Sequence, residues 1–546
     1  MKSIRFFYII FSISLITACS TMKQKADLIV INAKVYTVDS CSKIAEAIAV
    51  KNGKILATGT RSEISDGFSA PETIDLMGKV VYPGLIDAHC HFYGFALGLQ
   101  YVDLLGCVSF DEVIQRIQVV NVAEGKWLVG RGWDQNLWAE KRFPDNSRLN
   151  LLFPKTPVML IRVDGHVVLA NQAALDAAKI DRQNSFGPGQ VEIKNNILTG
   201  ILREMAADKI RSSAPVPTGK DLEDLIQEAE RRCFSVGLTT VSDAGLDYEQ
   251  VMILDSMQRT GKLSIQAYAM LTPNAANVRN LVKKGIYQTD NLIVRSIKLY
   301  ADGSLGSRTA KLKQEYSDAP GETGLIVTSP DSIQLLCKLA KDHGYQVNTH
   351  CIGDSAVHLI LKIYGELLMG KNNLRWRIEH AQVVDLADLH FFGDYSIIPS
   401  IQATHATSDM YWAVERLGPV RIKGAYAYKT LMLQNGWIPN GTDFPIENIS
   451  PLRTFYAAVA RQDLKGFPEG GFEKENALSA EEALRSITIW AAKANFMEQR
   501  KGSLEVGKDA DFIVLDQDIM TIPIGKVPGV NVLMTYIGGR AVFMKQ

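Results

Sequence analysis

Short hydrophobic runs alternate with amphipathic stretches through the middle of the chain, as expected for strands followed by helices. Eight runs predict strands: Val81–His91, Leu238–Ala244, Ile265–Leu271, Val294–Asp302, Tyr345–Asp354, Arg375–His380, Tyr395–Gln402 and Gly436–Asp443. Helices are predicted between or after them: Leu222–Arg232, Asp331–Asp342, Ser355–Met369 and Ala480–Gln499. This alternation implies parallel strands with right-handed crossovers, and eight such units predict an α/β fold of the (β/α)8 TIM-like barrel type. Catalytic side chains of such a barrel lie at the C-terminal ends of its strands.

The two ends of the chain show a different pattern of short alternating strands. Asp27–Thr58 contains a hairpin signal at Asn52-Gly53, and Gly507–Met544 has the same character. Neither end alone buries enough apolar surface to be stable. Residues 27–79 and 500–546 are therefore expected to form one small β-sandwich beside a barrel of residues 80–499.

A long segment, Gln100–Arg232, separates the first two predicted barrel strands. A loop of that length without structure would be very unusual, so residues 100–232 are expected to form an inserted α/β subdomain. Its own strands are predicted at Lys126–Arg131 and Val158–Asp164.

The first residues have the pattern of a signal peptide. Lys2 and Arg5 precede the apolar run Phe6–Ala18, which is too short to span a bilayer. The sequence Leu15-Ile-Thr-Ala-Cys19 resembles a bacterial lipobox, which predicts removal of residues 1–18, a lipid on Cys19 and a tether over residues 19–26. The expected location is the cell envelope, anchored to a membrane outside the cytoplasm. The alternative is an ordinary secretory signal with an incidental cysteine.

Composition and charge exclude several classes of protein. Hydrophobic residues make up 47% of the chain and charged residues 22%, the balance of a globular protein with a large core. Lys plus Arg and Asp plus Glu both number 59, so no net charge draws the chain to nucleic acid. The seven cysteines include no CxxC pair, which disfavours a disulfide framework. Strand alternation turns Cys90 and Cys351 away from the neighbouring histidines, as buried thiols.

Candidate metal ligands occur in order at the predicted strand ends. Histidines at i and i+2 of one strand point to the same side, so both can bind one metal ion. Alternation also points a lysine inward on a later strand, where a salt-bridged or snorkelling lysine is the other interpretation. The candidates in barrel order are His89, His91, Lys298, His350, His380 and Asp443.

The string Pro83-Gly-Leu-Ile-Asp-Ala-His89-Cys-His91 resembles the first-strand signature of the amidohydrolase superfamily. Nearly the whole mature chain is similar to amidohydrolase family 3, the branch that includes N-substituted formamide deformylases. Matching segments include Gly130–Asp134, Arg162–His166, Gly200–Glu204, Lys298–Ala310, His350–Asp354, Glu379–Gln382, His405–Met410 and Gly441–Pro445. The departures are Cys351, where a small aliphatic residue is expected, and Thr442, where serine is usual.

The resemblance implies a metal-dependent hydrolase that cleaves a C–N bond of a small molecule: an amide, N-formyl or N-acyl bond. It implies two divalent ions, with zinc favoured, that lower the pKa of a water molecule and polarise the carbonyl. The ligands would be His89, His91, a carboxylated Lys298, His350, His380 and Asp443. Asp443 would also act as the catalytic base and return the proton to the leaving nitrogen.

Substrate contacts are expected from the insert and from the end of the seventh strand. The insert residues Arg162, Asp164 and His166 would bind substrate if the insert folds over the barrel mouth; otherwise they form an internal ion pair. His405 is the candidate after the seventh strand. The alternatives for the whole protein are hydrolysis of a cyclic amide or ester at the same site, or a non-catalytic lipoprotein of this fold. The sequence leaves a homodimer open.

Overall fold

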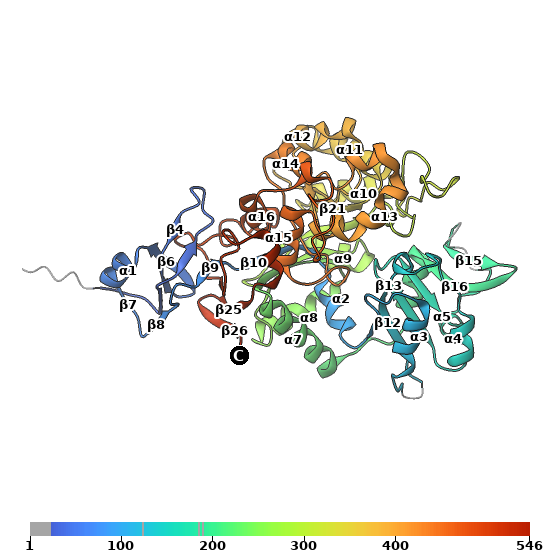
Figure 1. Ribbon diagram of the computed structural model, residues 1–546, viewed down its shortest axis with the longest axis horizontal. Coiled ribbons are helices and arrows are strands. Elements are labelled where there is room, and N and C mark those ends of the chain that lie inside the picture. Colours follow the sequence, from blue (N-terminus) through green and yellow to red (C-terminus); the bar gives the residue numbers. More distant parts are fainter. Residues whose placement is uncertain (1–22, 123–124, 184–185, 188–189) are drawn as a thin grey trace, which may run out of the picture.

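The computed structural model describes residues 23–122, 125–183, 186–187 and 190–546. Figure 1 shows three parts along the long axis: the chain ends on one side, the barrel in the middle and the inserted sheet on the other side. The predicted signal peptide and Cys19 lie outside the described residues. The last part of the expected tether is ordered, because β1 (Gln24–Lys25) pairs with β7 (Phe68–Ser69).

Seven parallel strands form a nearly closed barrel, which confirms the predicted fold class. In spatial order they are β10 (Leu85–Cys90), β17 (Leu238–Leu246), β18 (Gln266–Leu271), β20 (Leu292–Tyr300), β21 (Gln346–Cys351), β22 (Arg377–His380) and β23 (Ile398–Ser400). The short β19 (Tyr287–Gln288) pairs antiparallel to β20.

The predicted eighth strand, 436–443, is reduced to a single parallel bridge between Ile401 and Asn440. Pro439 has no N–H to donate, and the N–H of Asn440 goes to the carbonyl oxygen of Ser486 at 3.0 Å instead of a strand. The segment still lies between β23 and β10, because Gly441 donates to Ile401 and Ala88 donates to Asn440.

The predicted first strand, 81–91, is split in two. β9 (Val80–Pro83) pairs with a C-terminal strand, and β10 begins at Leu85. Gly84 marks the break: its N–H donates to the carbonyl oxygen of Asp511 at 2.9 Å. A Cβ atom at Gly84 would lie 2.4 Å from the hydroxyl oxygen of Thr239, so only glycine fits there.

Helices cover the barrel, and their amphipathic faces pack on the hydrophobic core around the strands. They are α2 (Phe92–Gly98), α7 (Gly219–Ser235), α8 (Tyr248–Arg259), α9 (Ala275–Asn280), α10 (Pro330–Asp342), α11 (Asp354–Leu368), α12 (His390–Asp394), α13 (Ala403–Arg421), α14 (Tyr428–Asn435), α15 (Pro451–Ala460), α16 (Ala480–Ser486) and α17 (Ile489–Ala494). The single helix predicted over 480–499 is thus broken, at Thr488, where the backbone is not helical.

Both chain ends contribute to the part beside the barrel. One sheet has the order β6 (Lys54–Gly59), β5 (Ala47–Lys51), β2 (Leu28–Ile31) and β8 (Glu72–Asp75). The other has the order β26 (Arg540–Met544), β25 (Val532–Ile537), β24 (Phe512–Leu515), β9, β3 (Lys34–Tyr36) and β4 (Ile44–Ala45). Side chains of both sheets share one core, which includes Val30, Val50, Val81 and Phe512. The short α1 (Arg61–Gly67) packs at the edge.

The inserted segment forms a mixed six-stranded sheet. Its order is β11 (Val102–Asp103), β12 (Leu128–Trp133), β13 (Val158–Arg162), β14 (Val167–Ala170), β16 (Ile197–Arg203) and β15 (Val191–Lys194). Its helices are α3 (Phe110–Gln118), α4 (Ser147–Leu152), α5 (Gln172–Ala178) and α6 (Glu204–Arg211). The insert sheet and its helices therefore end by Arg211, whereas α7 packs on the barrel core.

Within the described residues, no helix has the length and apolar character needed to cross a membrane.

Candidate metal centre

The two histidines of the first barrel strand lie side by side at its C-terminal end. His89 belongs to β10, and His91 follows as the N-terminal cap residue of α2. The Nδ1 atom of His89 is 2.6 Å from Oε2 of Glu379, and that of His91 is 3.0 Å from the carbonyl oxygen of Ala244. The Nε2 atoms are left to face Asp443, at 3.7 Å and 3.3 Å from its Oδ1.

Lys298 extends from β20 into the barrel interior, where it meets the first-strand histidines. Its Nζ is 3.2 Å from Nε2 of His89, and the residue is buried. Burial lowers the pKa of the Lys298 ammonium to about 8, although Glu379 and Asp443 act in the opposite direction. A larger share of this amine is therefore neutral near pH 7 than of an exposed lysine.

His350 stands at the end of β21, on the strand next to Lys298. The end of this strand is held by Asp302, whose carboxylate accepts the N–H groups of Ile352 and Gly353 at 3.0 Å and 2.8 Å. The ring of His350 is buried, and its centre is 4.6 Å from that of His380. The adjacent Cys351 lies in the apolar core, as predicted for this thiol and for Cys90.

His380 reaches the centre by a different route from the predicted one. Strand alternation was expected to turn it inward, but in β22 the inward residues are Arg377 and Glu379, of which Glu379 contacts His89. His380 comes next with a φ of 71°, and this left-handed backbone turns its side chain back to the site. Its Nδ1 is 4.0 Å from Oδ2 of Asp443.

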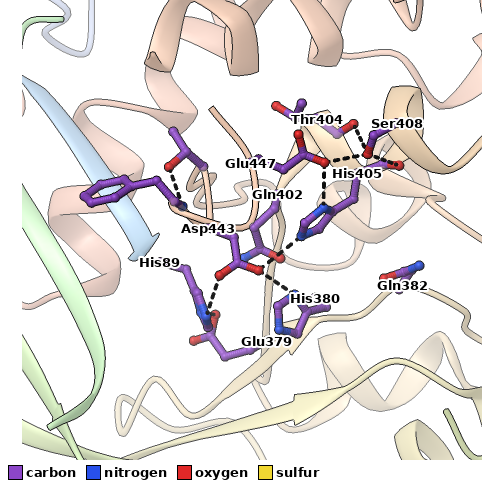
Figure 2. A network of polar contacts seen from close by, with 12 residues as sticks. His89, Glu379, His380, Gln382, Gln402, Thr404, His405, Ser408, Asp443 and Glu447 are labelled. Carbon is purple, nitrogen blue, oxygen red and sulfur yellow. Dashed lines mark hydrogen bonds and ion pairs between the residues drawn. The ribbon is translucent and has the colours of Figure 1, made fainter. Parts of the chain in front are cut away.

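Asp443 is the centre of the polar network in Figure 2. Its Oδ2 is 3.2 Å from Nε2 of His405 on α13, and Nδ1 of that ring is 3.3 Å from Oε1 of Glu447. Burial alone would raise the pKa of Asp443, but His405, His91 and His89 hold it well below its usual range. The contacts with Asp443 and Glu447 raise the pKa of His405 well above its usual range, against the effect of burial. Asp443 is therefore an ionised carboxylate held from one side by His405.

Of the three candidates on the insert, His166 lies against the centre. Its ring centre is 5.2 Å from that of His350. Its Nδ1 is 2.9 Å from Oε2 of Glu204, the first residue of α6. Burial would lower the pKa of His166, but the charge of Glu204 raises it to about 9.

Arg162 and Asp164 are tied to groups of the protein. The buried guanidinium of Arg162 donates to Asp134, Gln135 and Asp164, which is the internal ion-pair arrangement. Asp164 also accepts a hydrogen bond of 2.6 Å from the hydroxyl of Ser304, on the loop after β20. Asp164 thus joins the insert to the barrel beside the candidate centre.

Four residues that shape this centre were not among the sequence candidates: Glu379, Glu447, Glu204 and Ser304. Glu379, Glu204 and Ser304 lie inside the motifs that match the family, and Glu447 lies four residues after Asp443. In the sequence, these residues show only that an acidic or hydroxyl side chain lies near a candidate ligand. That pattern does not distinguish a residue of the site from a residue of the surface.

The collected donors fit a divalent metal ion. Ligand atoms of His89, His380 and Asp443 lie within 4.8 Å of one another, with Lys298 and His350 next to them. Nδ1 of His380 is buried and, among the described residues, has no hydrogen-bond partner. An unsatisfied buried polar atom costs free energy unless another group binds it. Imidazole and carboxylate donors suit zinc and similar divalent metals.

A parallel α/β barrel with these donors at the C-terminal ends of its strands has the architecture of a metal-dependent hydrolase. The model of the Amidohydrolase family matches residues 72–543, and the chain belongs to this family. This confirms the resemblance found in the motifs.

Similar proteins cover almost the whole chain. Protein LONG AFTER FAR-RED 3 of Arabidopsis thaliana is 30% identical, over 95% of this chain and 92% of its own. The N-substituted formamide deformylase of Arthrobacter pascens is 27% identical, over 95% of this chain and 98% of its own. The crystal structure of an uncharacterized metal-dependent hydrolase from Pyrococcus horikoshii superposes with a TM-score of 0.74 at 30% identity, covering 91% of this chain and 99% of that one. The protein is thus a hydrolase, and the donors at its candidate centre are those of a site for a divalent metal ion.

Proposed function

We propose that the protein hydrolyses the C–N bond of a small amide, with an N-formyl or N-acyl group as the scissile acyl part. The observation that carries this proposal is the convergence of four imidazoles and one lysine, from the ends of four barrel strands, around the ionised carboxylate of Asp443. The similarity to an N-substituted formamide deformylase supports the choice of bond.

Two divalent ions, zinc in our proposal, would be held by His89, His91, Lys298, His350, His380 and Asp443. When bound, they supply an acidified water molecule and a polarised carbonyl group. Asp443 accepts a proton from the attacking water, which its ionised state allows, and delivers that proton to the leaving nitrogen. The contact of His405 with Oδ2 keeps the carboxylate oriented, with Oδ1 toward His89 and His91.

We propose further that Lys298 is carboxylated in the working enzyme. Its neutral amine attacks carbon dioxide, a C–N bond forms and one proton is released, which leaves an anionic carbamate in place of a cation. The buried position and the lowered pKa of Lys298 support this step, because only the neutral amine is a nucleophile. A bare ammonium would instead repel the cations proposed here.

We also propose that the mature chain is held at a membrane of the cell envelope by a lipid on Cys19. The support is the leader pattern that ends in Leu15-Ile-Thr-Ala-Cys19. Labelling of the wild-type protein by a radioactive fatty acid, lost in Cys19→Ser, is expected; equal labelling of both would contradict the proposal.

The proposed activity is tested by metal analysis combined with a substrate screen. We expect one to two equivalents of divalent metal in active protein, and release of an amine from at least one N-formyl or N-acyl amine. Active protein with less than one equivalent, or turnover confined to esters, would overturn the proposal.

A further inference from the structure

Arg131, on strand β12 of the insert, has a guanidinium without a direct ion-pair partner among the described residues. Within the residues that the structure describes, its guanidinium forms no hydrogen bond and no ion pair, and its Nε atom is buried. Its neighbour on the next strand, Arg162, contrasts with it, because that guanidinium binds two carboxylates and an amide. The half-buried side chain of Arg131 thus keeps a buried Nε donor without an acceptor, which costs free energy unless another group binds it.

The guanidinium of Arg131 lies against the turn at Gly165, next to the metal centre. A Cβ atom at Gly165 would lie 3.7 Å from its Nη2. Gly165 directly precedes His166, whose ring centre is 5.2 Å from that of His350. A second guanidinium, Arg211 at the end of α6, donates to the carbonyl oxygen of Gly165.

Electrostatic coupling links Arg131 to the centre itself. Burial and the charge of Arg211 lower the pKa of Arg131 to about 10, while the charges of Asp443 and Asp164 act in the opposite direction. The charge of Asp443 therefore acts on Arg131, in keeping with the position of the guanidinium at Gly165, one residue before the His166 that lies against the centre.

We infer that Arg131 binds a carboxylate of the substrate, on the part of the molecule that remains with the leaving nitrogen. This rests on the proposed function and narrows it to amides that carry an anionic substituent. Arg131 presents a planar fork of donors, the geometry that pairs with a carboxylate through two hydrogen bonds. The neighbouring Arg211 is already paired with Asp208, so one positive charge is left over. That charge matches a monoanion rather than a dianionic phosphate.

The test compares N-formyl ω-amino acids of increasing chain length with the N-formyl amino alcohols of equal length. In the holoenzyme we expect kcat/KM to be at least about tenfold higher for the best acid, mainly through KM, because a charge-assisted hydrogen bond is involved. Arg131→Met should remove this preference and Arg131→Lys should keep part of it. The control is Arg148→Gln, which removes an exposed arginine of the same insert.

A second measurement separates this inference from the proposed function. Calorimetry with hexanoate and hexanol, on wild type and Arg131→Met, reports anion binding without turnover. If no formamide is hydrolysed but hexanoate binding is lost in the folded variant, the proposed bond is wrong and the anion site stands. Equal kcat/KM for acids and alcohols in the wild type, or hexanoate binding unchanged in Arg131→Met, overturns the inference, since the anion would then lie elsewhere.

Discussion

His89 is held from both sides: Glu379 contacts its Nδ1, and Lys298 and Asp443 lie near its Nε2. Asparagine at this position cannot supply the imidazole donor. We expect His89→Asn to lose most of the bound metal and at least about a hundredfold in kcat together. Metal content by mass spectrometry and turnover on one amide check this. His390→Asn, which replaces an exposed histidine, is the control. A metal-replete but inactive His89→Asn would contradict its role as a ligand.

Lys298 allows a sharper test, because its proposed group can be supplied from outside. Lys298→Ala leaves a buried space beside His89 where the carbamate would stand. We expect the variant to be inactive and to regain part of its activity in acetate or propionate, with saturation. Lys298→Met should be inactive without rescue, because its side chain fills the space. The same residual rates with and without added acid would show that no carboxylate is needed there.

Residue-level prediction from the sequence succeeded where the backbone is regular. Alternation along β20 and β21 placed Lys298 and His350 inside the barrel, because from Ser296 onward β20 pairs with β21 without a shift in register, although an irregularity in β20 precedes Ser296. It failed as an argument for His380, because this last residue of β22 has a positive φ and its residue type does not predict one. Glu447 and Arg131 could not be identified from the sequence for a different reason: their importance depends on which distant elements pack beside them.

At the scale of elements, the insert is joined to the barrel through Asp164 and Ser304. Because this bond lies beside the centre, its loss should loosen the position of the insert rather than unfold it. We expect Ser304→Ala to raise KM for the best amide by roughly threefold to tenfold, the cost of one hydrogen bond to a charged group. Asp164→Ala should act more strongly, by at least about tenfold in kcat/KM, since Arg162 also loses a partner. Metal content should stay unchanged in both variants; metal loss would place Asp164 among the ligands.

His166 gives the same junction a dependence on pH. Its pKa is about 9 in the fold against 6.5 for the unfolded reference, so the protonated form is stabilised by folding. The stability that this pair adds is fully present below pH 6.5 and is lost as the pH rises through about 9. Its size is at most about 3 kcal/mol. Denaturant midpoints at pH 6, 8 and 10 should fall for the wild type and fall less for His166→Gln. Parallel falls in both proteins would contradict this.

The sequence predicted which strands and helices exist more accurately than it predicted where each one begins and ends. Barrel strands were found because each is a hydrophobic run between helices. The predicted eighth strand shrank to a bridge because Pro439 and the bond of Asn440 to Ser486 remove strand hydrogen bonds. The insert was expected to extend to Arg232, yet α7 packs on the barrel core. An amphipathic pattern shows that one face of a helix is buried, but it does not show which part of the protein covers that face.

On the scale of the whole molecule, the candidate ligands connect parts of the barrel that are far apart in sequence. They come from β10, β20, β21, the end of β22 and the segment after Asn440, so a bound ion links strands around most of the ring. An ion that binds only the folded state stabilises it by an amount set by its concentration over Kd, about 4 kcal/mol at a thousandfold excess. The eighth segment, which has one bridge to β23 in place of a strand ladder, should benefit most.

We therefore expect removal of metal by a chelator to lower Tm by several degrees, and added zinc to restore both Tm and activity. His89→Asn is the matched control, since a chain that has lost its ligand should melt at the same temperature with and without chelator. Hydrogen exchange gives the spatial readout: amides near Asn440–Asp443 and at the end of β10 should exchange faster in the chelated wild type, while those of the insert sheet stay unchanged. If the Tm of the wild type does not change although metal analysis shows that the chelator has removed the ions, the barrel end is rigid without them. The ligands would then be preorganised by protein contacts such as those of Glu379 and His405 alone.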